Sequence, residues 1–253
     1  MSRGTLFLLL ACKTGSLALA LLGYWPAALG FFFFPDFWMA YNLFVPTAQG
    51  ICPSLTRFET ALPEVWLTID DGPDPEDTPR ILDLLDRHRA RATFFLIGER
   101  AARTPELVRE IVRRGHGVGH HTHTHPAGTL WCASRARLEA ELDSASAALA
   151  PLAPPLRWFR APVGIKHFRL ARALARRGLV CVDWSLRSGD WISRAPETVR
   201  DNVLRKVRPG KIVLMHEGPS VPALLRVRAI ELVLEALADR GYRCVIPPPE
   251  KLR

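Results

Sequence analysis

From about residue 65 onward, short apolar runs alternate with longer amphipathic segments, and this alternation most limits what the chain can fold into. The apolar runs have the length of buried strands, whereas the amphipathic segments have helical periodicity. Strands are predicted at 65–69, 93–97, 117–119, 158–159, 179–185, 211–215 and 242–246. Helices are predicted at 78–88, 105–114, 135–149, 167–177, 196–207 and 221–240. The pattern predicts an α/β fold with a parallel sheet, either doubly wound or closed as a barrel.

Polar residues fall where the predicted strands end. Asp70 and Asp71 follow VWLTI, and Arg160 follows RWF. Asp190 comes soon after VCVDWSL, and His216 follows KIVLM. Because the carboxyl ends of parallel strands meet at one face of a βα barrel, these side chains are expected to converge at one site.

The adjacent carboxylates Asp70 and Asp71 stand at the end of the first of these strands. Side chains alternate along a strand, so we expect the two carboxylates to point to opposite sides of the chain and to take different roles. Gly72 and Pro73 then turn the chain out of the strand. Taken alone, an acidic pair before Gly-Pro is also typical of a polar turn.

The segment GHGVGHHTHTHP holds five histidines within ten residues, from His116 to His125. Two histidines four residues apart lie on one side of a helical turn and suit a divalent metal. Two registers compete: His121 with His125, or His116 with His120. We favour the first, because the neighbouring threonine and proline make the tighter local turn. With one aspartate, the pair forms a site that leaves coordination positions open for water and substrate.

Five segments taken in order identify a family. TIDDGP, HTHTHP, FRAPVG, SGDW and LMH resemble the five motifs of the NodB-homology polysaccharide deacetylases, carbohydrate esterase family 4. The resemblance extends from about residue 63 to 247 and implies an irregular (β/α) barrel of the NodB type. It further implies a metal-dependent hydrolase that removes N-acetyl groups from a peptidoglycan- or chitin-like amino-sugar polysaccharide.

The resemblance also implies roles for the catalytic groups. Asp70 resembles the base that takes a proton from metal-bound water, and Arg160 resembles the arginine that holds this base in place. His216 resembles the general acid that protonates the leaving amine. Asp190 resembles the aspartate that keeps this acid protonated.

By the same resemblance, the metal ligands are expected to be Asp71, His121 and His125. Zinc is the expected ion for nitrogen and oxygen ligands, and cobalt is the alternative. The backbone N–H of Val163 is expected to stabilise the oxyanion. Trp191 and Leu214 are expected to line the acetyl pocket.

Three positions depart from the family pattern. His120 stands where asparagine is frequent, Val163 where an aromatic residue usually follows the proline, and Glu217 where aspartate often follows the histidine. No catalytic group is lost, so we expect activity with an altered glycan preference. His120 is the rival ligand, because it lies directly beside His121.

Two other functions are compatible with the motifs. An O-acetyl esterase acting on xylan or another acetylated glycan would use the same attack by metal-bound water. A catalytically silent, membrane-anchored glycan-binding protein would keep the fold without the reaction, but the sequence retains both Asp70 and His216.

The amino terminus predicts a membrane anchor. Residues 15–34 carry no charge, and Lys13 and Asp36 bound this stretch, whose length suits one transmembrane helix. Basic residues precede it, so a single-pass protein with its catalytic domain outside the cytoplasm is expected. A cleaved signal peptide is one alternative, and a helical hairpin formed by residues 4–12 and 15–34 is another. We therefore divide the chain into an anchor at 1–45, a linker at 46–62 and a catalytic domain at 63–250.

Charge and cysteine content add little to the prediction of function. The formal net charge is +9, but the arginines are scattered over helix-like stretches without interleaved aromatic residues, so nucleic-acid binding is not expected. The five cysteines form no CxxC pair, which argues against a cysteine zinc site or a disulfide framework.

Overall fold

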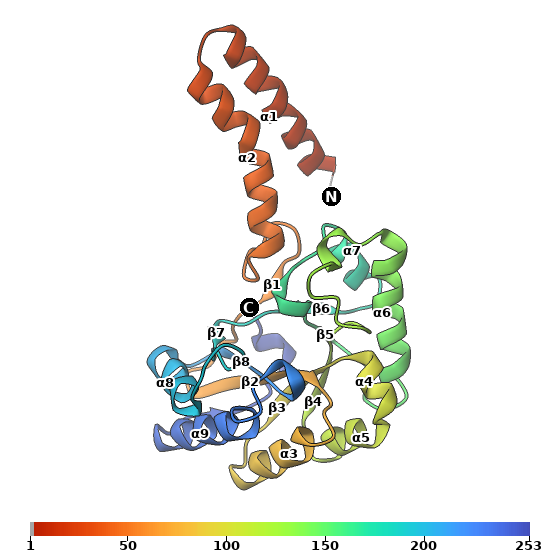
Figure 1. Cartoon of the computed structure of the whole chain (residues 1–253), viewed down its shortest axis with the longest axis vertical. Helices are drawn as coiled ribbons and strands as arrows, with labels where there is room; N and C mark the ends of the chain where they lie inside the picture. The colour runs from red at the N-terminus through yellow and green to blue at the C-terminus, as the bar shows by residue number, and fades with distance from the viewer. Residues whose placement is uncertain (1–2) are drawn as a thin grey trace.

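The computed structural model describes residues 3–253; positions 1 and 2, at the start of the predicted anchor, lie outside the described residues. Within this range the strands form one parallel sheet in the order β1-β6-β5-β4-β3-β2-β8-β7, and β9 pairs with β2. The strands are β1 (Ser54–Leu55), β2 (Glu64–Gly72), β3 (Ala92–Leu96), β4 (Gly117–His120), β5 (Trp158–Phe159), β6 (Val180–Val182), β7 (Leu186–Arg187), β8 (Ile212–His216) and β9 (Arg243–Cys244). The sheet is a curled half-barrel, so the predicted α/β class and the irregular barrel are confirmed in this open form (Figure 1).

Helices cover the outside of the curled sheet. They are α3 (Asp77–Arg87), α4 (Gly98–Arg103), α5 (Pro105–Arg113), α6 (Arg135–Leu149), α7 (Leu170–Ala175), α8 (Pro196–Lys206) and α9 (Arg226–Asp239). Their apolar faces pack on the strands; Ile81 and Leu85 of α3, for example, join Ile69 and Phe94 of the sheet in the largest core cluster. Burial of such side chains is the main stabilising contribution to the domain.

The predicted elements are found with three differences. The single strand expected at 179–185 is interrupted, and its region contains β6 and the start of the turn to β7. Helix α4 was not predicted, because six residues are too few to show a helical period. Helix α9 begins at Arg226, because the residues before it form a separate turn in which Leu225 N donates to Pro222 O at 2.8 Å.

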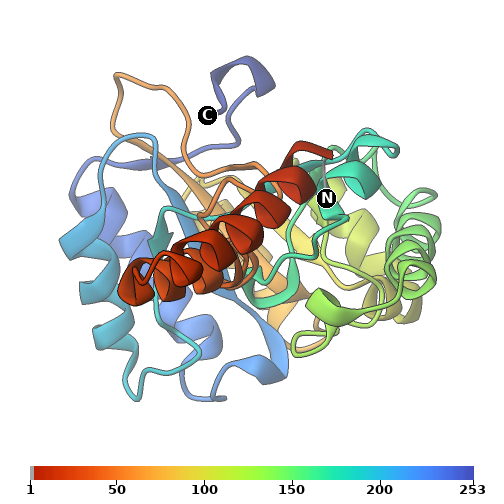
Figure 2. The same ribbon diagram turned by 90° about the horizontal axis from the view of Figure 1, so that it is seen from above.

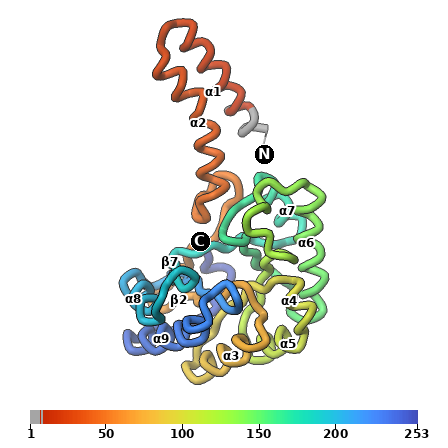
Figure 3. The backbone as a smooth tube through the Cα atoms, in the orientation of Figure 1, coloured from red at the N-terminus to blue at the C-terminus, as the bar shows by residue number. Residues whose placement is uncertain are grey.

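The amino terminus folds into a helical hairpin that projects from the domain (Figure 1, Figure 3). Helix α1 (Arg3–Leu21) and helix α2 (Trp25–Phe44) are joined by a tight turn in which Gly23 has φ 82°. The expected single helix over residues 15–34 is therefore wrong, because this turn divides it; the hairpin alternative is closer, with different bounds. No helix among the described residues combines the length and apolarity that crossing a bilayer requires.

The segment predicted as a linker is fastened to the sheet. Ser54 and Leu55 form β1 and pair with β6. The backbone N–H of Lys166 donates to Leu43 O at 2.8 Å, and its buried ammonium donates to Ala48 O at 2.7 Å. Pro46 lies so close to Gly164 that a Cβ there would come within 2.5 Å of the proline ring. The end of the hairpin thus packs against the loop that follows β5.

Candidate active site

The carboxyl ends of the central strands surround a cavity of about 290 Å³. It is lined by Asp70, Asp71, His121, His125, Val163, Trp184, Arg187, Trp191, Leu214, His216 and Ser220. Eight of these are residues that the sequence predicted for the site. The remaining two predicted residues, Arg160 and Asp190, are buried and contact the cavity residues Asp70 and His216. The expected convergence at the strand ends is confirmed.

Asp70 ends the regular part of β2 between β3 and β8, where it is the register partner of Phe95 and His216. Its Oδ1 accepts a hydrogen bond of 2.7 Å from Nη1 of the fully buried Arg160. The same guanidinium also donates to Thr68 Oγ1 and to two backbone carbonyls, and it stacks over the ring of Phe95. Arg160 is therefore held in one orientation and fixes the Asp70 carboxylate in turn.

The expectation that the carboxylates of Asp70 and Asp71 point to opposite sides of the chain is wrong. Asp71 has φ 72°, in the left-handed region, and the register with β3 shifts between Asp70 and Gly72. This irregularity breaks the strand alternation, so both carboxylates line the same cavity. Arg100 stabilises the bend by donating to Asp71 O at 2.6 Å.

His121 and His125 meet Asp71 at the cavity. Their Nε2 atoms lie 3.4 and 3.2 Å from Asp71 Oδ1, and their ring centroids are 4.9 Å apart. The helical turn expected here is wrong: Thr122 and His125 have φ 64° and 56°, and the chain forms a loop. Buried Glu141 of α6 shapes this loop by accepting from the backbone N–H groups of His123 and Thr124, each at 2.9 Å.

His120, the rival ligand, faces away from the cavity. Its Nε2–H donates to Leu142 O at 3.0 Å and its Nδ1 accepts from Thr122 N, so both ring nitrogens are used. His116 is buried against Phe94 on the outer side of the sheet. Burial lowers the pKa of each of these two imidazoles to about 4. The register of His121 with His125 is thus the one that places both rings beside a carboxylate.

The residues present fit a divalent metal. In the part of the chain that the structure describes, Asp71, His121 and His125 form one group whose potential ligand atoms all lie within 4.8 Å of one another. Asp71 Oδ1 is buried and accepts no hydrogen bond. His121 donates its Nδ1–H to Arg160 O at 2.8 Å, and its Nε2 is directed at Asp71 Oδ1. Burial would raise the pKa of Asp71, but the imidazoles of His121 and His125 outweigh burial and hold it well below the usual range.

His216 and Asp190 form a pair on another side of the cavity. Asp190 Oδ1 accepts from His216 Nδ1 at 2.9 Å, and Oδ2 accepts from the His216 backbone N–H at 2.7 Å. Burial would lower the pKa of His216, but the charge and hydrogen bond of Asp190, with smaller contributions from Asp70 and Asp71, raise it to about 9. The imidazole is therefore a cation at neutral pH, a proton donor whose Nε2 edge is available to a ligand.

Apolar and polar walls complete the cavity. Val163, with φ 50°, and Trp191 are about half exposed at its rim, whereas Leu214 is buried. The sequence did not identify three further lining residues, Trp184, Arg187 and Ser220. Of these, only the tryptophan gave a usable signal, because it lies near the end of the strand predicted at 179–185.

Comparison with known proteins agrees with this geometry. The family model described as polysaccharide deacetylase matches residues 59–182. A chitooligosaccharide deacetylase of Sinorhizobium fredii is 38% identical over 200 residues, covering 75% of this chain and 92% of the relative. The chain belongs to the polysaccharide deacetylase family. Its named relatives are hydrolases that act on carbon–nitrogen bonds, and this chain shares that class.

Two further members of the family are also similar. A peptidoglycan-N-acetylglucosamine deacetylase of Bacillus cereus is 34% identical over 186 residues, covering 73% of this chain and 67% of the relative. A crystal structure of a peptidoglycan N-acetylglucosamine deacetylase in complex with 4-naphthalen-1-yl-N-oxidanyl-benzamide superposes with a TM-score of 0.69. It is 33% identical and covers 75% of this chain and 88% of that one. The polysaccharide deacetylase fold is thus shared over three quarters of this chain.

Proposed function

We propose that this polysaccharide deacetylase removes N-acetyl groups from an acetylated amino-sugar polysaccharide of the chitooligosaccharide or peptidoglycan kind. The supporting observation is the presence of two pairs at one cavity: Asp70 held by Arg160, and His216 held by Asp190. Amide hydrolysis requires both, because the attacking water must lose a proton and the departing nitrogen must gain one.

Asp71, His121 and His125 would hold a divalent ion, with zinc the first choice for these ligands and cobalt the second. A bound ion of this kind supplies a Lewis acid that polarises the acetyl carbonyl and acidifies water. Asp70 does not belong to this ligand group and lies beside it, with its Oδ2 at 3.8 Å from His121 Nε2. Its carboxylate therefore remains available as a base.

Two side chains then carry out the proton transfers of the reaction. Asp70 takes a proton from water as the water oxygen bonds to the acetyl carbonyl carbon. His216 gives its proton to the nitrogen as the carbon–nitrogen bond breaks, and acetate and a free amine result. We propose that the Val163 N–H donates a hydrogen bond to the oxyanion. The acetyl methyl group would contact the wall formed by Trp191 and Leu214.

The protonated imidazole favours an amide over an ester as the substrate. An alkoxide leaves more readily than an amine, so an O-acetyl esterase needs a general acid less. A His216 whose pKa is raised to about 9 is suited to protonate an amine at neutral pH. The O-acetyl esterase is therefore the second candidate.

Acetate release tests this proposal. Purified full-length protein is incubated with N-acetylated chitooligosaccharide, peptidoglycan and O-acetylated xylan, and the Asp70→Asn and His216→Ala variants are compared with Asp201→Asn, which alters an exposed carboxylate of α8. We expect acetate from the N-acetylated glycans, lost in the first two variants and on chelation. Acetate from O-acetylated xylan but not from the N-acetylated glycans would favour the esterase, and no acetate from any glycan would overturn both. Location of the catalytic domain outside the cytoplasm stays a prediction.

A further inference from the structure

The helical hairpin presents a large apolar surface that nothing in the described chain covers. The four consecutive phenylalanines at 31–34 are 45 to 55% exposed, and Leu21 and Leu22 at the tip are 81 and 71% exposed. Seen from above, the hairpin lies over the middle of the catalytic domain (Figure 2), and from the side it projects away from it (Figure 1). Apolar surfaces of this kind mark contact with a partner or with lipid.

The part of the hairpin between Lys13 and Asp36, which includes its tip, carries no charge. Lys13 of α1 pairs with Asp36 of α2 at 2.6 Å, and no charged residue lies between them in the sequence. Asp36 stands 11 residues along α2 from Trp25, or about 16 Å at the helical rise per residue. That depth matches about half of a hydrocarbon core that is about 30 Å thick. The uncharged end of the hairpin therefore has the length of one lipid leaflet.

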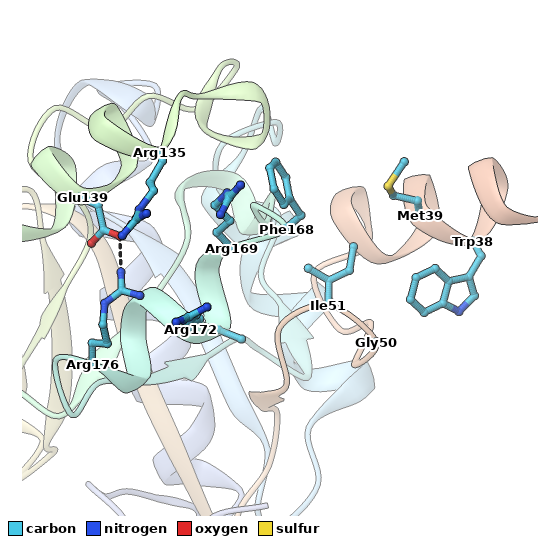
Figure 4. A pocket seen from close by; sticks show the side chains of 11 residues that line it. Trp38, Met39, Gly50, Ile51, Arg135, Glu139, Phe168, Arg169, Arg172 and Arg176 are labelled. Carbon is cyan, nitrogen blue, oxygen red and sulfur yellow. Dashed lines mark hydrogen bonds and ion pairs between the residues drawn. The ribbon is translucent and has the colours of Figure 1, made fainter. Parts of the chain in front are cut away.

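A cavity of about 460 Å³ lies at the foot of the hairpin (Figure 4). One side is largely apolar and comes from α2 and the segment after it: Trp38, Met39, Gly50 and Ile51. The other side comes from α6, α7 and the loop before α7: Arg135, Glu139, Phe168, Arg169, Ala171, Arg172 and Arg176. The cavity therefore combines four guanidinium groups with a partly aromatic wall.

The positive charge of this cavity is only partly compensated. Glu139 is its one carboxylate, and it already pairs with Arg176 and Arg177. Arg169 lies over the ring of Phe168 at 5.2 Å, and neither Arg169 nor Arg172 forms an ion pair with any described residue. Guanidinium groups without carboxylates bind phosphate well, because their planar N–H donors match its oxygens.

We propose that this cavity binds the phosphate of an anionic phospholipid, with the hairpin inserted into one leaflet of the bilayer. The Lys13–Asp36 pair marks the depth of insertion, and the cavity begins two residues further along α2, at Trp38. Trp38 and Tyr41 occupy the interfacial level that such rings favour. Arg169 and Arg172 then face the phosphates, while the acyl chains follow the apolar surface of α2. This inference does not depend on the deacetylation.

Vesicle binding by the full-length chain tests the proposal. Sedimentation is measured with vesicles of phosphatidylcholine alone and of phosphatidylcholine mixed equally with phosphatidylglycerol. The Arg169→Gln/Arg172→Gln variant removes the two unpaired guanidinium groups. Its control, Arg80→Gln/Arg109→Gln, removes two exposed arginines from α3 and α5, at the opposite end of the molecule (Figure 1). A third variant, Phe33→Ser/Phe34→Ser, reduces the apolar surface of the hairpin.

We expect the Arg169/Arg172 variant to bind the phosphatidylglycerol vesicles about 30-fold more weakly, which corresponds to about 1 kcal/mol for each arginine. Its binding to phosphatidylcholine alone should persist, the control should bind as the natural protein does, and the phenylalanine variant should lose binding to both vesicles. Acetate release from a soluble substrate, and circular dichroism, check that each variant is folded.

Three results would overturn the proposal. If the Arg80/Arg109 control weakened vesicle binding equally, the effect would be due to net charge and not to the cavity. Loss of vesicle preference in the presence of inorganic phosphate, with direct phosphate binding that is unaffected by the phenylalanine substitutions, would assign the cavity to a free anion. Binding to neither vesicle, with dimers in light scattering, would assign the apolar surface to a second copy of the chain.

Discussion

Asp190 holds His216 through both of its carboxylate oxygens, one on the imidazole and one on the backbone N–H. The side chain is thereby oriented as well as charged. A general acid needs both properties, since the proton must be present and must point at the leaving nitrogen.

The Asp190–His216 pair predicts the alkaline limb of the pH profile. The pKa of His216 is raised to about 9, so the imidazole is protonated below that pH, and kcat should fall as pH rises through it. Asp190→Asn removes the main group that opposes the effect of burial, so the limb should move by about one pH unit or more toward neutrality. The pH dependence of kcat is measured beside Asp201→Asn, which should leave it unchanged. An unmoved limb in Asp190→Asn would assign the acid to another group.

The metal site predicts different outcomes for two histidines. His125→Ala removes a proposed ligand, and zinc affinity should fall by at least about 100-fold, since even partners of ligands change affinity by about 10- to 100-fold. His120→Asn should change zinc affinity little, because both nitrogens of His120 already bond to the backbone. Competition with a chromophoric chelator measures both. Strong loss of zinc in His120→Asn with retention in His125→Ala would reverse the assignment.

Glu217 predicts a pH-dependent stability. It is fully buried, and burial raises its pKa from 4.5 to about 8. Because the folded pKa lies above the unfolded one, the stabilising contribution is present below about pH 4.5 and is lost as pH rises to about 8. Glu217→Gln keeps an oxygen for the Thr78 hydroxyl and does not ionise. Its Tm should therefore decline less across this range; parallel declines for both proteins would refute the prediction.

The buried ion pair between Lys166 and Asp183 predicts a large effect on stability. The two groups are 3.2 Å apart and neither side chain is exposed. Lys166→Met leaves Asp183 buried without a counter-charge, which should cost about 3 to 5 kcal/mol in urea unfolding. Lys166→Met/Asp183→Asn should recover a large part of this loss. A double variant as unstable as the single one would mean that the packing of Lys166, and not its charge, is what matters.

Much of the fold of the catalytic domain was predictable, because the periodicity of its sequence is regular and polar residues stand at strand ends. The positions of Asp70, Arg160 and His216 follow from those two facts. That Asp70 and Asp71 share one cavity could not be predicted, because Asp71 has a positive φ and breaks the strand alternation on which the prediction relied. The loop of His121 and His125 was missed for a similar reason: Glu141, sixteen or more residues away, accepts the hydrogen bonds that shape it.

The amino terminus was harder to predict from composition alone. Twenty uncharged residues predict one helix, yet a turn at Gly23 divides them, and Lys13 is matched with Asp36 across the two helices that result. Trp184, Arg187 and Ser220 were likewise missed, because their place in the cavity depends on the path of the chain from β6 through β7 and after β8.

The contact of Pro46 with Gly164 couples the segment after the hairpin to the loop that follows β5. A truncation that ends before residue 43 would leave this contact in place, whereas one that ends later would remove the chain on which the loop of Val163 rests. For protein engineering, residues 43–55 therefore belong with the enzyme and not with the hairpin, and a foreign segment should be joined before residue 43.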